Sequence, residues 1–269
     1  MPDIANKIGI VGCGSIGAGI ARAIDGGALK ADLFGVCDAD AAMAGSLVSS
    51  LKTKPAVLPL ADLVAGCDIV VECAAGPAVE AVADECLKQG KDLMVMSVGG
   101  LTAGLLSRFE ESSSNLYVPS GAVCGIDGVL AASMAGIESL SLTTRKPPAG
   151  LAGAPYLEQN GISLDGLTGE KIVFEGSPED AIRGFPKNVN VSTTLALASA
   201  AGDKFIVRVI ADPASSGNTH EIEMRGAAGT VHIKVDNVPS AQNPRTSALA
   251  YYSAIALLKK ILSRVKIGA

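Results

Sequence analysis

The chain has 269 residues, of which 48% are hydrophobic and 18% charged, and its formal net charge is −5. This apolar content is enough for packed cores and excludes an intrinsically disordered chain. The acidic balance and the aromatic content of 3% argue against a nucleic-acid partner and against an anionic membrane surface. No apolar run reaches the roughly 18 residues of a membrane-spanning helix. The length corresponds to about two domains.

Six cysteines fall in the first half of the chain and form no Cys-x-x-Cys pair. They are Cys13, Cys37, Cys67, Cys73, Cys86 and Cys124. We interpret them as small apolar side chains in a reducing compartment, and we expect neither a disulfide framework nor a metal site. No basic segment followed by an apolar run begins the chain, so the sequence predicts a cytoplasmic protein.

Short apolar strands alternate with helix-like segments through the first 120 residues. The predicted strands are 8–11, 33–37, 68–73, 92–98 and 115–119. The predicted helices are 15–24, 39–51, 77–89 and 102–111. This alternation is typical of an α/β domain whose parallel sheet is covered on both faces.

Residues 121–242 have a different pattern, in which strands come in clusters. The predicted strands are 139–144, 171–175, 205–210, 221–225 and 230–235, and the predicted helices are 125–137 and 191–201. This pattern predicts a second α/β domain with an open sheet of mixed or antiparallel type. Asn243 and Pro244 form a helix-start signal, so we expect a helix over 244–264. We assign 243–269 to the first domain, which this helix would complete.

A glycine motif follows the first predicted strand and opens the first predicted helix. Its sequence, Gly12-Cys13-Gly14-Ser15-Ile16-Gly17, fits G-x-G-x-x-G. The first glycine permits a tight turn, the second lets a pyrophosphate approach the backbone, and the third lets the helix pack closely. The motif and its context predict a Rossmann dinucleotide-binding domain over 1–120. We expect Gly12, Gly14, Ser15, Ile16 and Gly17 to bind the cofactor.

Asp38 follows the second predicted strand, where a carboxylate can accept hydrogen bonds from the ribose diol of the cofactor. The same carboxylate would repel a 2′-phosphate, so we predict NAD as the preferred cofactor, with NADP as the alternative. Ala74 and Ala75 follow the third predicted strand, and Gly99 and Gly100 follow the fourth. Ligands bind at the carboxyl ends of such strands, so we expect these small residues to line the cofactor site.

The chain contains only two histidines. Strand alternation places His232 on a polar face, where we expect it to be solvated. His220 shares an apolar face with Ile222 and Met224, and it follows a loop of turn-forming residues. From this geometry His220 is either a structural core histidine or a general acid/base, and both interpretations remain open.

Several segments of the second half resemble the L-aspartate dehydrogenase family. They are Pro119–Asp127, Leu142–Pro148, Phe185–Val191, Ala211–Pro213, Asn218–Ile222, Asn237–Ser240 and Asn243–Ser247. The resemblance covers nearly the whole chain, and these segments are more specific than the glycine motif. It implies a Rossmann domain with a returning C-terminal helix, plus an α/β catalytic domain.

The resemblance also implies a reaction. L-Aspartate would be oxidised with NAD(P) to iminoaspartate, which water converts to oxaloacetate and ammonia. The family serves NAD biosynthesis, its imine product can pass to quinolinate synthase, and its members form homodimers. Its active-site histidine matches His220, which would act as general acid/base, and its nicotinamide-cofactor positions match Ala122 and Asn188.

A dicarboxylate substrate requires cations or hydrogen-bond donors. The sequence has Arg145, Lys146, Lys187 and Arg245 beside these segments. We rank Lys187 first because it precedes Asn188, and we add Arg145 and Asn218 as further substrate-binding candidates. For any one of these cations, the alternative is a solvated surface charge.

Two alternatives to this family are other dehydrogenases of similar layout and a non-catalytic NAD-binding protein. A sugar dehydrogenase of the glucose–fructose oxidoreductase type would carry Glu-Lys-Pro where this chain has Met96–Gly100. Dihydrodipicolinate reductase would show a histidine pair, and homoserine dehydrogenase would use a lysine and act on an alcohol. A non-catalytic NAD-binding sensor would keep the glycine motif but would not need an inward-facing His220.

Overall fold

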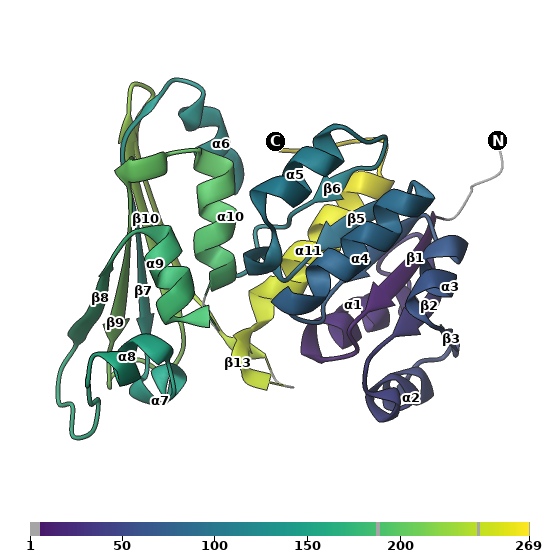
Figure 1. Cartoon of the computed structure of the whole chain (residues 1–269), viewed down its shortest axis with the longest axis horizontal. Helices are drawn as coiled ribbons and strands as arrows, with labels where there is room; N and C mark the ends of the chain where they lie inside the picture. Colours follow the sequence, from purple (N-terminus) through teal and green to yellow (C-terminus); the bar gives the residue numbers. More distant parts are fainter. Residues whose placement is uncertain (1–5, 187–188, 241–242, 269) are drawn as a thin grey trace. The chain divides into compact units, whose positions relative to one another are not determined.

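The computed structural model describes residues 6–186, 189–240 and 243–268. The chain folds into two compact units, which Figure 1 shows. The first unit comprises Met1–Pro119 and Tyr251–Ile267, and the second comprises Ser120–Ala250 with the terminal Gly268–Ala269. Within the described residues, no helix combines the length and the apolar character needed to cross a bilayer.

The first unit contains a parallel sheet of six strands in the order β3-β2-β1-β4-β5-β6. The strands are β1 (Asn6–Val11), β2 (Ala31–Cys37), β3 (Ala56–Val57), β4 (Ile69–Glu72), β5 (Asp92–Val95) and β6 (Leu116–Tyr117). This order is that of a Rossmann domain, which confirms the predicted fold. Val11 pairs with both Cys37 and Glu72, so β1, β2 and β4 end at the same edge of the sheet.

Two sets of helices cover the two faces of this sheet. One set is α1 (Ser15–Asp25), α2 (Ala41–Ser50) and α11 (Ala248–Leu262), and the other is α3 (Leu60–Gly66), α4 (Gly76–Gln89) and α5 (Ala103–Glu110). On the first face, Ile8 and Ile10 of β1 pack with Leu258 of α11. On the other face, Val70 packs with Val79 of α4. The strands read as continuous apolar runs because both of their faces are buried.

The C-terminal helix begins later than the sequence predicts. Helix α11 starts at Ala248, whereas Asn243–Ser247 form strand β13, which pairs with β12 (Pro239–Ser240). The expected helix start at Pro244 is therefore wrong. Proline suits the first turn of a helix, but it is also tolerated in an edge strand. Here the segment pairs with β12, and it therefore forms a strand instead of the first turn of the helix.

The second unit contains a mixed sheet of five strands in the order β11-β10-β7-β9-β8. The strands are β7 (Ile137–Lys146), β8 (Lys171–Gly176), β9 (Phe205–Ala211), β10 (Thr219–Gly226) and β11 (Gly229–Asp236). Strands β7 and β9 are parallel, and the other neighbours are antiparallel, which confirms the predicted mixed sheet. The expected helix over 125–137 is shorter, because α6 (Ile126–Ser133) is followed by a turn at Gly136, whose φ is +93°.

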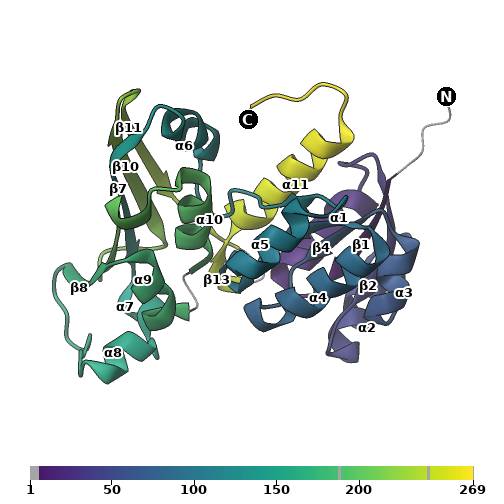
Figure 2. The ribbon, with the colours of Figure 1, turned by 45° about the horizontal axis from the view of Figure 1, so that its top comes forward.

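One face of this sheet is buried beneath helices. Along β7, the side chains of Leu140, Leu142, Thr144 and Lys146 alternate toward it. Helices α6 and α10 (Val189–Ser199) pack over these side chains, and Figure 2 shows α10 lying along the sheet. The second unit is completed by the short helices α7 (Pro148–Leu151), α8 (Pro155–Gln159) and α9 (Pro178–Gly184). Polar residues at the end of β7 therefore share a buried face with an apolar core.

Candidate active site

The glycine motif forms the turn between β1 and α1. Gly12 has a φ of +96°, and a Cβ there would lie 2.5 Å from the backbone nitrogen of Ala74. A Cβ at Gly17 would lie 1.9 Å from the carbonyl oxygen of Gly12. Both positions require glycine for the protein to fold in this way, since a side chain would collide with the backbone.

Gly14 differs from these two glycines because a Cβ there would meet no atom within 4 Å. It is the N-cap of α1, whose first turn has no acidic residue and no side-chain cap. The amides of Ser15, Ile16 and Gly17 form the positive end of this helix, which favours an anion. The space beside Gly14 therefore fits a group from outside the protein, such as a dinucleotide pyrophosphate.

Asp38 holds the glycine motif against the end of β2. Its Oδ2 accepts a hydrogen bond from the backbone nitrogen of Cys13 at 2.6 Å, and its Oδ1 accepts one from that of Asp40 at 2.8 Å. An ionised carboxylate has about four acceptor positions, so it can also accept hydroxyl groups of a ribose. The geometry fits the role that the sequence assigns to Asp38.

Glu72 is a feature of this edge that the sequence interpretation missed. Its side chain is fully buried at the end of β4. Oε1 accepts from the backbone nitrogen of Ala74 at 2.8 Å and from the hydroxyl of Ser97 at 2.9 Å, and Oε2 accepts from the nitrogen of Ser97 at 3.0 Å. Burial raises the pKa of Glu72, although these hydrogen bonds oppose that effect. The signal was an acidic residue at the end of an otherwise apolar run, Ile69–Glu72.

Glu72 thus ties together the loops that follow β4 and β5. The two loops are in backbone contact, because a Cβ at Gly100 would lie 2.4 Å from the carbonyl oxygen of Gly76. Ala74 and Ala75 are exposed in the first of these loops. The structure therefore brings Ala74 and Ala75 to the sheet edge where the glycine motif lies. Their role in cofactor binding stays a prediction.

His220 lies on the buried face of the second unit's sheet, opposite Thr144 of β7. Its side chain is 4% exposed, and its Nδ1 is 3.0 Å from the hydroxyl oxygen of Thr144. This hydrogen bond orients the ring through Nδ1, and the role of His220 as general acid/base stays a prediction. Burial, and then the charge of Lys146, lower the pKa of His220 from 6.5 to about 3. The ring is therefore neutral near pH 7.

Lys146 lies on the same face as His220, two residues beyond Thr144. Its side chain is 7% exposed, and burial lowers its pKa from 10.5 to about 8. The ammonium form still predominates at pH 7, so the end of β7 carries a buried positive charge. From the sequence, Lys146 was one of four basic residues considered as candidates for binding a carboxylate.

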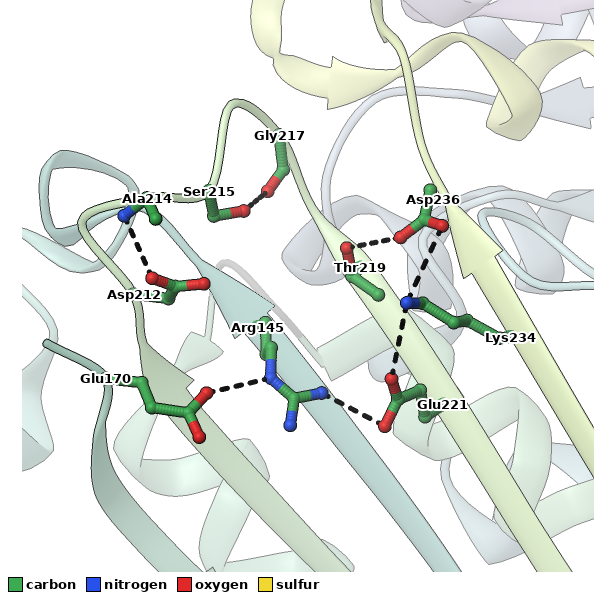
Figure 3. A network of polar contacts seen from close by, with 10 residues as sticks. All are labelled: Arg145, Glu170, Asp212, Ala214, Ser215, Gly217, Thr219, Glu221, Lys234 and Asp236. Carbon is green, nitrogen blue, oxygen red and sulfur yellow. Dashed lines mark hydrogen bonds and ion pairs between the residues drawn. The ribbon is translucent and has the colours of Figure 1, made fainter.

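Arg145 points to the opposite face of β7. Figure 3 shows its guanidinium between Glu170 and Glu221. Its Nε is 3.3 Å from Oε2 of Glu170, and its Nη1 is 3.0 Å from Oε2 of Glu221. The hydrogen bond that Arg145 donates to Glu221 raises the pKa of Arg145, burial opposes this effect, and the hydrogen bond donated to Glu170 adds to it. The structure does not bring Arg145 and His220 to one face, and the substrate-binding role of Arg145 stays a prediction.

The second histidine, His232, lies on β11, and its exposed side chain points outward from that strand.

Asn218 and Ala122 both contact Asn237 within the second unit. The carbonyl of Asn218 accepts from the backbone nitrogen of Asn237 at 2.9 Å, and that of Ala122 accepts from its Nδ2 at 3.0 Å. The side-chain oxygen of Asn237 is buried and has no hydrogen-bond partner in the described part of the chain. A donor such as a carboxamide group would satisfy it. Lys187 and Asn188 lie outside the described residues, as does the side chain of Arg245.

Comparisons with sequence families cover both units. Residues 12–119 match the family described as homoserine dehydrogenase, NAD binding domain. Residues 127–261 match the family described as aspartate dehydrogenase, C-terminal. The first unit is therefore a domain for a pyridine nucleotide, in agreement with its glycine motif.

Curated relatives match along the full chain. It is 48% identical over 268 residues to the L-aspartate dehydrogenase of Methanosarcina mazei, covering 97% of this chain and 99% of that protein. It is 40% identical over 264 residues to the L-aspartate dehydrogenase of Nitrosopumilus maritimus, covering 96% and 97%.

Solved structures share the fold. The aspartate dehydrogenase of Thermotoga maritima superposes with a TM-score of 0.74 at 24% identity, covering 98% of this chain and 99% of that one. The myo-inositol dehydrogenase of Lactobacillus casei, in complex with NAD(H) and myo-inositol, has a TM-score of 0.61 at 12% identity, covering 99% and 88%. Both structures share the fold, so the family is assigned from the full-length identity to L-aspartate dehydrogenases and from the matched C-terminal family. The chain belongs to the L-aspartate dehydrogenase family, whose members are oxidoreductases that act on the CH–NH2 group.

Proposed function

We propose that this protein catalyses the reversible NAD-dependent oxidation of L-aspartate to iminoaspartate, which water converts to oxaloacetate and ammonia. The observation that carries the proposal is the full-length identity of 48% to a curated L-aspartate dehydrogenase. Two features of the structure support it. The edge of the first unit fits a dinucleotide, and the second unit buries a histidine and a lysine on one face.

His220 is the general acid/base in this proposal. When bound, the nicotinamide cofactor supplies the acceptor for the hydride from C2 of aspartate. Water then attacks C2 of the imine, and Nε2 of His220 takes a proton from that water. The same nitrogen returns a proton to the amino group as ammonia leaves. Thr144 keeps the ring oriented through its 3.0 Å hydrogen bond to Nδ1. Such proton transfers contribute about 10²–10⁴-fold to a rate.

The remaining site assignments are part of the same proposal. NAD binds to the glycine motif with Asp38 at its ribose and with Ala74 and Ala75 beside it, and Ala122 and Asn188 are kept as further candidates for contact with the cofactor. Lys187, Asn218 and Arg145 are kept as candidates for contact with the substrate. The preference for NAD over NADP is supported by the position of Asp38 after β2, because its carboxylate would repel the 2′-phosphate of NADP. A catalytic efficiency with NADPH equal to that with NADH would contradict this preference.

Family membership supports three broader proposals. The protein acts in the cytoplasm as a homodimer, and its imine product enters NAD biosynthesis through quinolinate synthase. A monomeric mass in light scattering at micromolar concentration would contradict the homodimer. Quinolinate formed by quinolinate synthase from L-aspartate, NAD and the three-carbon co-substrate of that synthase, only when this protein is present, would support the pathway assignment.

The decisive experiment is the loss of NADH absorbance with oxaloacetate, with and without ammonia. We expect consumption only when both are present, since reductive amination needs both. Consumption with oxaloacetate alone would indicate reduction of the carbonyl to an alcohol and would contradict the proposal. Absence of any consumption by protein that still binds NADH would favour the non-catalytic NAD-binding sensor.

A further inference from the structure

Two buried side-chain oxygens have no hydrogen-bond partner in the described part of the chain, those of Ser114 and Asn237. Ser114 lies just before β6 in the first unit, at the sheet edge opposite to the glycine motif. The oxygen of Asn237 lies in the second unit, in the segment that follows β11. A buried acceptor without a donor costs stability, so such a position requires an explanation, and a ligand is one.

Asn237 shares the buried face of the sheet with His220. His220 pairs with Val235, and the backbone nitrogen of Asn237 donates to the carbonyl of Asn218 at 2.9 Å, so the pairing of β10 with β11 continues to Asn237. Side chains alternate along paired strands, and those of Thr219 and Asp236 bond to each other on the other face, as Figure 3 shows. Asn237 and His220 are therefore diagonal neighbours, with Cβ atoms about 7–8 Å apart.

The side chain of Asn237 is held in one orientation. Its Nδ2 donates to the carbonyl of Ala122 at 3.0 Å. Only the nitrogen of an amide group can donate, so this bond determines which end of the group is the oxygen. The backbone is also confined, because a Cβ at Gly217 would lie 2.7 Å from the carbonyl oxygen of Asn237. The structure therefore presents a fixed acceptor on the face that carries His220.

This acceptor matches one part of an amino dicarboxylate. Carboxylates and a keto oxygen have no proton to donate at pH 7, whereas an amino group, an imine and ammonia all carry N–H donors. The charge of the acceptor matters as well. A carboxylate in this place would raise the pKa of the amine and hold it as ammonium, from whose carbon a hydride cannot leave. An uncharged amide oxygen binds the nitrogen without this effect.

We propose that Asn237 is a substrate-binding residue, whose side-chain oxygen accepts a hydrogen bond from the reacting nitrogen. That nitrogen is the amino group of L-aspartate in one direction and ammonia in the other. The inference rests on the proposed function, because it takes the substrate to carry an amino group at C2. It adds a division of labour to that function: Asn237 holds the nitrogen, and His220 moves its protons.

The first test measures binding to the full-length protein saturated with NADH, by calorimetric titration with L-aspartate and with succinate. The two ligands differ only in the amino group, and neither reacts with NADH. In Asn237→Leu, which keeps the size of the side chain, we expect the Kd for L-aspartate to rise about tenfold and that for succinate to stay within about twofold. An equal loss for both ligands would overturn the proposal, since it indicates a structural role.

The matched control is Asn160→Leu. Asn160 also donates through Nδ2 to a backbone carbonyl, that of Tyr156 at 2.8 Å, but its side chain is exposed at the end of α8. We expect wild-type affinity for both ligands in this variant.

A second variant separates the acceptor of Asn237 from its bond to Ala122. Asn237→Asp keeps an acceptor oxygen and loses the donor. We expect it to prefer L-aspartate over succinate at least as strongly as the wild type does, because the added charge attracts the ammonium form and repels succinate. Its kcat for aspartate oxidation should nevertheless fall about tenfold or more, because the amine stays protonated. The same loss of preference in the Asp and Leu variants would assign Asn237 to the support of Ala122 alone and overturn the proposal.

Reductive amination gives an independent measurement, since its nitrogen and its carbon skeleton arrive as separate substrates. In Asn237→Leu we expect the KM for ammonia to rise about tenfold and that for oxaloacetate to stay within about twofold. A higher Kd for NADH with an unchanged KM for ammonia would assign the oxygen to the carboxamide of the cofactor and overturn the proposal.

The two proposals fail in different ways. Suppose that the wild type prefers L-aspartate over succinate, that Asn237→Leu does not, and that NADH is not consumed with oxaloacetate and ammonia. The proposed function would then be overturned, and Asn237 would remain a residue that binds an amino group. Normal turnover with a wild-type KM for ammonia in Asn237→Leu would overturn the role of Asn237 alone.

Discussion

Glu72 in the first unit and His220 in the second are both buried ionisable groups at strand positions, yet their surroundings differ. Glu72 accepts three hydrogen bonds from Ala74 and Ser97, which belong to two loops. Among the described residues, His220 has a hydrogen bond to Thr144 and a basic neighbour in Lys146. Glu72 is held by several hydrogen bonds of the described residues, whereas the ring of His220 is held through Nδ1 and lies near a positive charge. Burial alone therefore does not mark a catalytic group, and the environment of each buried group has to be considered.

The largest effect should come from replacing His220. In His220→Ala we expect turnover to fall about a hundredfold or more, because the proton-transfer group is lost. The affinity for NADH should stay nearly unchanged, as measured by fluorescence titration. His232→Ala is the matched control, since that side chain is exposed on the outer face of β11. Unchanged turnover in His220→Ala would remove this residue from the mechanism.

Replacing Glu72 should affect stability rather than chemistry. In Glu72→Gln the shape is kept, but an amide group turns a donor toward donors from Ala74 and Ser97. We expect the free energy of unfolding to fall by about 1–3 kcal/mol, measured in urea. The folded fraction should lose much less turnover than His220→Ala. Full stability combined with loss of turnover would contradict the structural role of Glu72.

The pH dependence of stability should have opposite signs for the two groups. The pKa of His220 is lowered from 6.5 to about 3 in the folded protein. Between these two pH values, His220 is protonated in the unfolded chain and neutral in the folded one. Stability should therefore fall as the pH drops from 6.5 toward 3, by about 1.4 kcal/mol per pH unit. The raised pKa of Glu72 acts in reverse, since stability is lost as the pH rises above 4.5 through its folded pKa.

Urea unfolding at pH 7, 6 and 5 separates these contributions when the wild type is compared with His220→Gln. The variant should lack the loss of stability below pH 6.5. Parallel pH profiles for the two proteins would show that His220 is accessible to protons in the folded state.

The smallest effect concerns space at the cofactor edge. In Gly14→Ala we expect the fold to be kept, because the added Cβ meets no protein atom within 4 Å. The Kd for NADH should rise about tenfold if a pyrophosphate needs that space. Gly17→Ala is the contrasting variant, since its Cβ would collide with the backbone, and it should lower the thermal stability even without NADH. Wild-type affinity in Gly14→Ala would place the pyrophosphate elsewhere.

The sequence predicts the first unit well because its signals are local. The Rossmann order follows from strands that alternate with helices, and the position of Asp38 follows from the strand before it. Thr144 and His220 are 76 residues apart, and only the pairing of β7 with β10 brings them together. The start of α11 was mispredicted for the same reason, since β12 competes for Asn243–Ser247.

The placement of Arg145 and Lys146 on opposite faces of β7 lay within reach of the sequence. Leu140 and Leu142 point into the core, and alternation along one strand then puts Lys146 inside and Arg145 outside. The sequence did not show the full burial of Lys146, because that depends on helices from distant parts of the chain. Local periodicity thus predicts on which face of the sheet a side chain lies, whereas its electrostatic environment depends on the tertiary packing of distant segments.

Helix α11 has a consequence for how the protein is made. Its fully buried Ala254 and Leu258 complete the core of the first unit, although the second unit separates them in sequence from the rest of that core. A ribosome therefore releases the glycine motif long before the partner that closes its domain. Until α11 emerges, the first unit exposes an apolar face that chaperones and proteases can recognise. A chain cut short before Ala248 should be degraded rather than accumulate as a cofactor-binding fragment.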